Sequence, residues 1–284
     1  MASNSMSTAF RTSNTVITAF GILNQFHGSI TSSYVVRKDS TINYKRNCFP
    51  SLGPTKVPTA KYFGIGINGF ENIVDTNMSE PFLPDPQNLD LYEPIPFRMI
   101  PLEDDAAFAA EREANGYRLR CIEEVNGVQY ACYYLKLIEF EQSSPSLTMV
   151  DANDHETPFE IDVVNKLNPA PSRPTTTSII NATTNRIVAS LPGICSIYGS
   201  EVVEVMNIKY GAEGMRRAKI SELGIYTGED VRIIPEQHGG DLEYTEAIYT
   251  QLSAHRCWIG TFAGDPSVKL RERYVFENGS MILV

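Results

Sequence analysis

The sequence is poor in the side chains that form catalytic and metal sites. It has four histidines and one tryptophan in 284 residues, and no two of its five cysteines stand at CxxC spacing. A nucleophilic triad or a zinc site needs such side chains in combination, and the Gly-x-Ser-x-Gly elbow of many hydrolases is also missing. We therefore expect no catalytic residues, no metal site, no cofactor and no enzymatic activity.

Long apolar runs are missing as well. Because no stretch of about 18 apolar residues occurs, we expect no membrane-spanning helix. Residues 1–11 lack a basic region followed by an apolar core, so we expect no secretory signal. The odd, widely spaced cysteines favour reduced, buried thiols in a cytoplasmic setting over a disulfide framework, with Cys121 and Cys132 as possible neighbours.

Positive charge is scarce. Lys and Arg together number 24 against 34 Asp and Glu, which gives a net charge of −10 and a pI near 5.0. A surface of this sign repels phosphate, so nucleic acid is not an expected partner of the whole molecule. The basic segment at Arg216, Arg217 and Lys219 is the exception, because it could face a DNA channel.

Aromatic and β-branched residues are plentiful instead. Fourteen tyrosines and thirteen phenylalanines suit sheets and interfaces, where a ring packs and a hydroxyl stays solvated. The sequence therefore predicts a mainly β (α+β) fold. We expect an antiparallel β-sandwich or barrel-like core with two short helices and long extended arms and loops.

Composition along the chain suggests four regions. They are an N-terminal arm (1–47), a β-rich region with a short helix at 104–114 (48–141), a loop, linker or insertion (142–185), and a second β-rich region with a helix at 244–255 (186–284). The two β-rich regions are expected to share one core.

Turn residues give the clearest local predictions. Asn126-Gly127 supplies both positive-φ residues of a type I′ turn between strands at 117–122 and 128–138. Gly116 is a suitable end for the helix at 104–114, whose first turn is acidic. A second Asn-Gly pair, Asn278-Gly279, predicts a hairpin near the C-terminus.

Periodicity suggests the remaining elements. Strands are expected at 57–70, 186–191, 201–210 and 219–226, and one at 159–164. Helix 244–255 would place four apolar residues on one face at helical spacing. These residues are Tyr244, Ala247, Ile248 and Leu252.

Two motifs suggest ligands but have simpler interpretations. Residues 64–69 spell GxGxxG, yet the following segment leaves no room for the helix that would bind a pyrophosphate, so we interpret it as a strand with glycines. The acidic segment 151–156 offers oxygen ligands for calcium at Asp151, Asn153, Asp154 and Glu156, although it lacks the EF-hand pattern. This segment supports an alternative function, a soluble carbohydrate- or protein-binding module that depends on calcium. An enzyme would require His255, Cys257 or Glu246 to converge in a cleft.

Two C-terminal segments resemble tailed-bacteriophage virion proteins. The strand Ile220–Tyr226 (ISELGIY) is similar to one in tail and collar components, and 244–256 with the ending at 276–279 looks like phage structural proteins. The resemblance implies a virion protein, assembled in the host cytoplasm, that forms an oligomeric ring or joins parts at the neck, head-tail connection or baseplate. Its expected partners are copies of itself and other virion proteins.

Ring-forming virion proteins contact their neighbouring subunits through extended segments. The proline-studded loop 81–101 and the N-terminal arm are the segments of this kind here. We expect the interface residues to be Tyr34, Val35, Val36, Phe82, Leu91, Tyr92 and Phe97.

Overall fold

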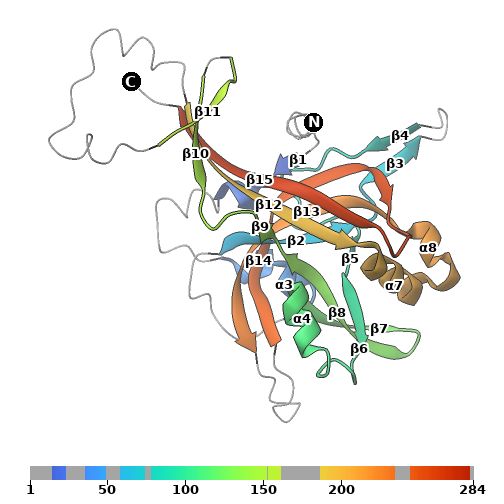
Figure 1. The fold of residues 1–284 in the computed structure, drawn as a ribbon. Helices are drawn as coiled ribbons and strands as arrows, with labels where there is room; N and C mark the ends of the chain where they lie inside the picture. The colour runs from blue at the N-terminus through green and yellow to red at the C-terminus, as the bar shows by residue number, and fades with distance from the viewer. Residues whose placement is uncertain are drawn as a thin grey trace, which may run out of the picture. The chain divides into compact units, whose positions relative to one another are not determined.

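The computed structural model describes residues 15–23, 36–48, 58–73, 78–151, 153–160, 186–233 and 244–281. The chain divides into two compact units. Unit 1 comprises residues 1–138 and 197–270, and unit 2 comprises residues 139–196 and 271–284. Strands account for more than half of the described residues, and their pairings within the described ranges are antiparallel (Figure 1). The mainly β prediction is therefore confirmed, and the described strands do not close into a barrel.

The strands are β1 (Thr15–Ile17), β2 (Thr59–Gly66), β3 (Phe70–Ile73), β4 (Met78–Pro81), β5 (Pro94–Ile95), β6 (Arg98–Pro101), β7 (Tyr117–Val125), β8 (Val128–Leu137), β9 (Glu139–Phe140), β10 (Ser146–Val150), β11 (Glu156–Pro158), β12 (Arg186–Tyr198), β13 (Lys219–Ile233), β14 (Tyr244–Phe262) and β15 (Lys269–Met281). The helices are α3 (Ile42–Lys45), α4 (Ala109–Asn115), α7 (Gly199–Tyr210) and α8 (Gly214–Arg217). Residues 19–23 are also helical, and 3-10 turns occupy Lys38–Ser40 and Gly211–Glu213. None of the helices in these ranges is long and apolar enough to cross a membrane.

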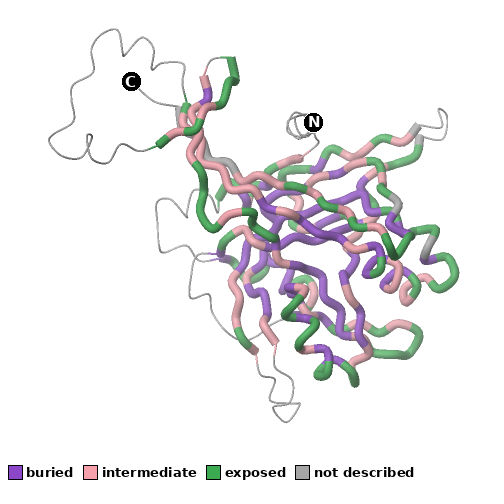
Figure 2. Tube along the Cα trace, viewed as in Figure 1, coloured by how far each residue is buried: buried purple, intermediate pink, exposed green. Residues whose placement is uncertain are grey.

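An eight-stranded sheet forms the centre of unit 1. Its strands run β1-β14-β13-β2-β8-β6, with β5 added to β2 and β7 added to β8. The inner strands are buried along most of their length (Figure 2). Helix α7 covers part of the sheet through Val202, Val205 and Met206, each fully buried at i, i+3 and i+4 spacing.

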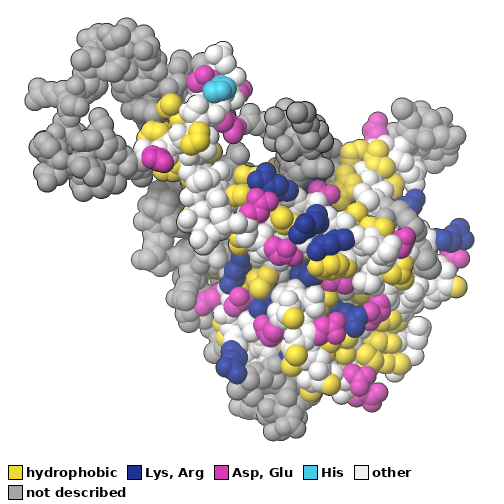
Figure 3. All heavy atoms as spheres, in the orientation of Figure 1, with side chains coloured by type: hydrophobic (Ala, Val, Ile, Leu, Met, Phe, Trp, Pro, Cys, Tyr) yellow, Lys and Arg dark blue, Asp and Glu magenta, His cyan; other side chains and the backbone are white. Residues whose placement is uncertain are grey.

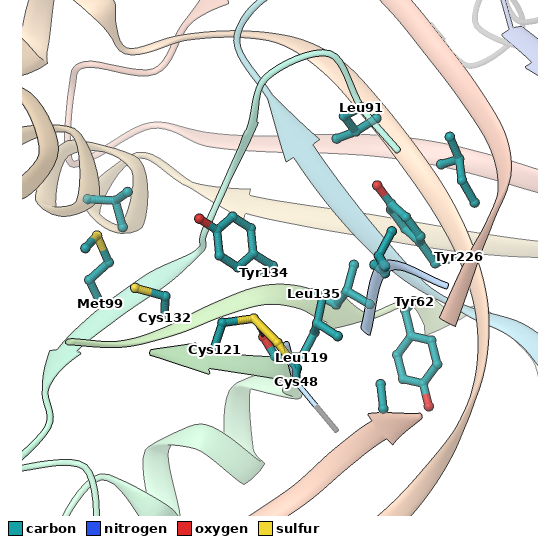
Figure 4. Close-up of a cluster of buried hydrophobic side chains, with 14 residues drawn as sticks. Cys48, Tyr62, Leu91, Met99, Leu119, Cys121, Cys132, Tyr134, Leu135 and Tyr226 are labelled. Atoms are coloured by element: carbon teal, nitrogen blue, oxygen red, sulfur yellow. Dashed lines mark hydrogen bonds between the residues drawn. A yellow bond between two sulfur atoms is a disulfide. The ribbon is translucent and has the colours of Figure 1, made fainter. Parts of the chain in front are cut away.

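The core of unit 1 contains a disulfide that the sequence analysis did not predict. Cys48 and Cys121 are bonded, and they sit among buried apolar residues that include Tyr62, Leu119 and Leu135 (Figure 4). The prediction of reduced thiols is therefore wrong for this pair. The other cysteines, at 132, 195 and 257, are free and buried as predicted.

The predicted central hairpin is confirmed. Strands β7 and β8 pair from Val125↔Val128 outward, and both turn residues, Asn126 and Gly127, have positive φ. Helix α4 ends at Gly116, whose φ of 66° is left-handed as expected for a C-terminal glycine. The helix begins at Ala109, because residues 102–108 form turns in place of its predicted first part.

Two predicted elements have the opposite secondary structure. Residues 244–255 belong to strand β14, and residues 201–210 belong to helix α7. Strand β14 is buried on both faces over much of its length, so it shows no period-2 alternation and its apolar residues fit a helical spacing by chance. In the second case β-branched valines suggested a strand, although packing of one helical face prevailed.

Two further predictions also need correction. Residues 278–279 lie inside the continuous strand β15, so no turn forms at Asn278-Gly279. Residues 142–160, predicted to be a loop, contain the hairpin β10–β11; of the strand predicted at 159–164, residues 161–164 lie outside the described residues. The glycines at 64–69 end strand β2 and lead into β3, which is a strand and not the helix of a dinucleotide site.

Unit 2 is built on a five-stranded sheet. Its order is β11-β10-β12-β15, with β9 also paired to β12. Among its described residues, the fully buried side chains are few: Val150, Cys195 and Ser196. Most side chains of β12 are half-buried, so this sheet carries little core of its own within the described ranges.

Candidate functional site

Three chemically reactive side chains meet on the β13–β14 ladder of unit 1. Glu222 of β13 stands opposite Cys257 of β14, and His255 lies two residues before Cys257 on the same strand. Residues two apart on a strand point to the same face, so the ladder gathers all three side chains. Val16 of the edge strand β1 pairs with His255, which places the group inside the sheet.

The three side chains are in direct contact and buried. His255 Nε2 lies 3.1 Å from Glu222 Oε2 and 3.4 Å from Cys257 Sγ. The exposed fraction is 0% for Glu222 and His255 and 2% for Cys257. Among the residues that the structure describes, this is the one group of His, Cys, Asp or Glu side chains whose ligand atoms lie close enough together to hold a metal ion.

Backbone amides from a separate loop hold the Glu222 carboxylate in place. Its Oε2 accepts from the Tyr92 amide at 2.7 Å, and its Oε1 accepts from the amides of Glu93 and Asn68 at 3.1 and 3.0 Å. These hydrogen bonds fasten the loop before β5 and the turn after β2 onto β13. A buried carboxylate with this many donors is satisfied, so its removal would leave several amides without partners.

The imidazole of His255 is held on its other side too. Its Nδ1 lies 3.3 Å from the Asn88 side-chain nitrogen, and the Tyr92 ring packs 5.1 Å from the imidazole, centroid to centroid. The contacts at both ring nitrogens fix the orientation of the ring. Nε2 is therefore aimed at Glu222 and Cys257.

The Cys257 thiol is unsuited to act as a nucleophile. Burial raises its pKa to about 12, and the neighbouring negative charge of Glu222 raises the pKa in the same direction. At neutral pH the sulfur is therefore protonated unless another positive charge replaces the proton. Nucleophilic catalysis needs the thiolate, so this arrangement gives no support to a Cys-His enzyme.

An enzyme would require His255, Cys257 or Glu246 to converge, and only part of this group does. His255 and Cys257 do come together, but Glu246 lies nine residues away along β14, or about 30 Å at the rise of a strand. The Glu246 carboxylate accepts from the amides of Leu119 and Arg120 instead. Sequence analysis missed Glu222, although a lone acidic residue within the apolar strand Ile220–Tyr226 was a usable signal.

A second feature of unit 1 is a pair of contacting segments that carry several exposed apolar side chains. Residues 17–23 and 82–92 touch through a hydrogen bond from the Ala19 amide to the Pro86 carbonyl, at 2.8 Å. Six of the large exposed apolar side chains of the described chain belong to them: Ile17, Ile22, Leu23, Leu83, Leu89 and Tyr92. We call this the 17–23/82–92 surface. Concentrated apolar exposure of this kind is typical of interaction sites.

The predicted interface residues lie in different environments in the structure. Val36, Leu91 and Phe97 are buried in the core of unit 1, so their prediction as interface residues is wrong. Tyr92 is 43% exposed and contacts the half-buried Phe82, with ring centroids 5.5 Å apart, so this pair is placed at the 17–23/82–92 surface. Tyr34 and Val35 lie outside the described residues.

The acidic segment 151–156 is closed on itself. Asp151 Oδ1 accepts from the amides of Asn153 and His155, at 2.8 and 2.9 Å, and these hydrogen bonds lower the pKa of Asp151. Asp154 forms an ion pair with Arg186 at 3.3 Å. Both carboxylates therefore have partners within the hairpin region, which is the pattern of an ordinary acidic turn.

The basic segment near residue 216 does not form an isolated positive patch. Arg216 pairs with Glu213 at 3.4 Å, and the Arg217 guanidinium lies 4.9 Å from the centre of the Tyr210 ring. Acidic and basic side chains are also interspersed on the face that Figure 3 displays. Neither feature favours broad binding to a polyanion.

Comparison with known proteins identifies a family without a described activity. A family model described as a family of unknown function (DUF7208) matches residues 3–260. No curated protein and no solved structure matches the chain.

Proposed function

The chain belongs to the family of unknown function DUF7208, and we propose that it is a structural component of a tailed-bacteriophage virion. In this proposal it forms an oligomeric ring, or joins parts, at the neck, head-tail connection or baseplate. Its partners are copies of itself and other virion proteins.

The observation that carries the proposal is the 17–23/82–92 surface. Leu83 is 74% exposed and Ile22 is 59% exposed, although both belong to segments whose backbones are hydrogen-bonded to the folded core. Water-exposed leucine and isoleucine side chains gain free energy when a partner covers them, at about 25 cal/mol per Å². A surface of this kind on an ordered frame suits assembly better than catalysis.

The sheet of unit 2 supports the same proposal. Its strand β12 presents Ile187, Val188, Leu191 and Ile194 as half-buried side chains, and the exposed ring of Phe140 packs against Phe276 at 5.8 Å. Among the described residues this sheet has little core of its own. Half-buried and exposed apolar side chains of this kind are expected on a sheet that a neighbouring subunit covers.

The alternative, a calcium-dependent binding module, has weaker support. The carboxylates of Asp151 and Asp154 already accept hydrogen bonds from, or pair with, residues of the same unit. A calcium ion would have to replace these contacts, and oxygen ligands at six or more positions would be needed around it.

The experiment is absolute mass by light scattering behind a sizing column, with and without calcium. We expect a multimer that is insensitive to calcium, and closed rings of one cyclic symmetry by electron microscopy. The double variant Leu83→Ser/Leu89→Ser should form a smaller assembly than the wild type, while its thermal unfolding midpoint stays unchanged. The control is Ile122→Ser/Val128→Ser, which removes two other exposed apolar side chains, from the β7–β8 hairpin, and should assemble normally. A wild-type monomer at all concentrations would contradict the ring, and a calcium-dependent mass would favour the alternative.

A further inference from the structure

The Glu222–His255–Cys257 group has the donor atoms of a transition-metal site. We propose that these three side chains bind one divalent transition-metal ion, with zinc the best match to the donor set. Thiolate, imidazole and carboxylate are the three kinds of ligand that zinc takes in proteins. The inference rests on the contacts within unit 1 and is independent of the proposed virion role.

Two of the three distances between the ligand atoms are close to those around a tetrahedral ion, and the third, between Glu222 and Cys257, is at most 4.8 Å. With bonds of about 2.0–2.1 Å to nitrogen and oxygen and about 2.3 Å to sulfur, a tetrahedral zinc holds its N and O ligands about 3.4 Å apart and its N and S ligands about 3.6 Å apart. The corresponding distances here are 3.1 Å for His255 Nε2 to Glu222 Oε2 and 3.4 Å for His255 Nε2 to Cys257 Sγ. Small outward shifts would open the space for the ion.

Hydrogen bonding alone does not satisfy all three side chains of this group. An imidazole nitrogen has a single in-plane position for a proton or a metal, yet both Glu222 Oε2 and Cys257 Sγ lie within reach of His255 Nε2. One proton on Nε2 can be directed well at only one of them. A metal ion placed between the three atoms satisfies all of them together.

Charge also balances around a divalent ion. A Glu222 carboxylate, a Cys257 thiolate and a neutral His255 imidazole carry two negative charges in total, which a 2+ ion cancels. Binding replaces the proton of the Cys257 thiol, which is released to solvent, so charge is conserved. A neutral cluster is the form that a fully buried site favours.

The surroundings support the three side chains as ligands. The Tyr92 amide donates to the Glu222 oxygen that faces His255, and the amides of Glu93 and Asn68 hold the other oxygen. The Asn88 side-chain nitrogen lies 3.3 Å from Nδ1 of His255, and metal binding at Nε2 requires this amide to turn over so that its oxygen accepts the Nδ1 proton. Protein metal sites depend on such outer hydrogen bonds to orient their ligands.

The ion would serve the fold and not a reaction. All three side chains are buried, so a substrate has no access to the fourth coordination position. The ligands come from the neighbouring strands β13 and β14. Glu222 also accepts hydrogen bonds from the loop that contains Asn88, Tyr92 and Glu93. Metal binding would therefore fix the base of the 17–23/82–92 surface.

The test supplies cobalt during expression, because the buried site would load poorly in the finished protein. Cobalt replaces zinc in tetrahedral sites and reports a thiolate ligand by a charge-transfer band in the near ultraviolet. We expect this band, a single metal equivalent per chain, and loss of both in Cys257→Ser. The control Cys195→Ser removes another buried free thiol, from unit 2, and should keep the band.

A second measurement keeps the test decisive if Cys257→Ser fails to fold. X-ray absorption at the metal edge of the wild-type protein should find one sulfur ligand together with nitrogen and oxygen ligands. Absence of bound metal in protein expressed with cobalt or zinc would overturn the proposal. So would a bound ion without a sulfur ligand, or a charge-transfer band that survives in folded Cys257→Ser.

Discussion

Cys48 and Cys121 are joined by a disulfide across 73 residues, with their Cα atoms 5.6 Å apart. Cys48 follows helix α3 closely, and Cys121 lies in the middle of strand β7. The bond therefore fastens the segment around α3 to the central hairpin. Both cysteines are at least nine-tenths buried, at 8% and 5% exposure, so the covalent link runs through the core.

Replacing both partners should destabilise the protein strongly. The variant Cys48→Ser/Cys121→Ser restores conformational entropy to the unfolded chain, and for a closed loop of this length the loss of stability is about 4 kcal/mol. Urea denaturation of the oxidised wild type and the variant gives the difference. A reducing agent should lower the stability of the wild type and leave the variant unchanged. Equal stabilities before reduction would contradict a formed bond.

Asp105 should be far more important to stability than a surface carboxylate. Its oxygens accept from Arg120 at 2.7 Å, from Arg112 at 3.4 Å and from the hydroxyl of Tyr133, and both Asp105 and Arg112 are almost completely buried. Removing the negative charge in Asp105→Asn takes one buried ion pair away from each of two largely buried guanidiniums, at a cost of about 3–5 kcal/mol.

The matched control for Asp105 is the exposed pair Arg37–Asp39, whose charges are 2.6 Å apart. Solvent screens this contact, so Asp39→Asn should leave the urea midpoint where it is. Similar losses in the two variants would show that burial does not set the strength of the Asp105 network.

Glu246 should make the stability depend on pH. Burial raises the pKa of Glu246 from about 4.5 to about 7, against the opposing effect of amide hydrogen bonds from Leu119, Arg120 and Ala247. The folded protein therefore binds a proton more tightly than the unfolded chain. The contribution is fully present below pH 4.5 and is lost as pH rises to about 7, with a total change of up to about 3 kcal/mol.

The measurement for Glu246 is urea denaturation between about pH 4 and about pH 8, a range that spans the pKa values of the unfolded and folded states. Glu246→Gln should have lower stability throughout, because its amide nitrogen cannot accept the backbone hydrogen bond that a carboxylate oxygen accepts. The decline between the two pKa values should be smaller in this variant than in the wild type. Parallel curves would mean that Glu246 keeps an ordinary pKa in the folded protein.

The turn at Gly127 gives a test of backbone strain alone. Gly127 has a φ of 81° and no atom lies within 4 Å of the position that a Cβ would occupy. Gly127→Ala should therefore cost about 1 kcal/mol through the left-handed backbone only. Gly116→Ala should cost more, because Leu137 lies 3.0 Å from its Cβ position in addition to the positive φ of 66°. Thermal denaturation of both variants compares the two, and the reverse order would contradict this account.

The sequence by itself determined the features that depend on a few adjacent residues. Asn126-Gly127 specifies its turn, and Gly116 ends its helix, because left-handed backbone favours these residue types whatever lies around them. The mainly β composition and the strands β2, β8 and β13 follow from residue preferences that act over short segments.

Only the tertiary structure decided which segments lie in the middle of the sheet. Residues 244–255 are covered on both faces as part of β14, so burial erased the alternation that marks a strand. Residues 201–210 became helix α7 because Val202, Val205 and Met206 fill one face against the sheet. The meeting of Glu222 with His255 and Cys257 depends on the β13–β14 register, which has irregularities at three points. A shift of one residue would turn Glu222 to the opposite face, and no local sequence signal fixes a register between strands brought together by folding.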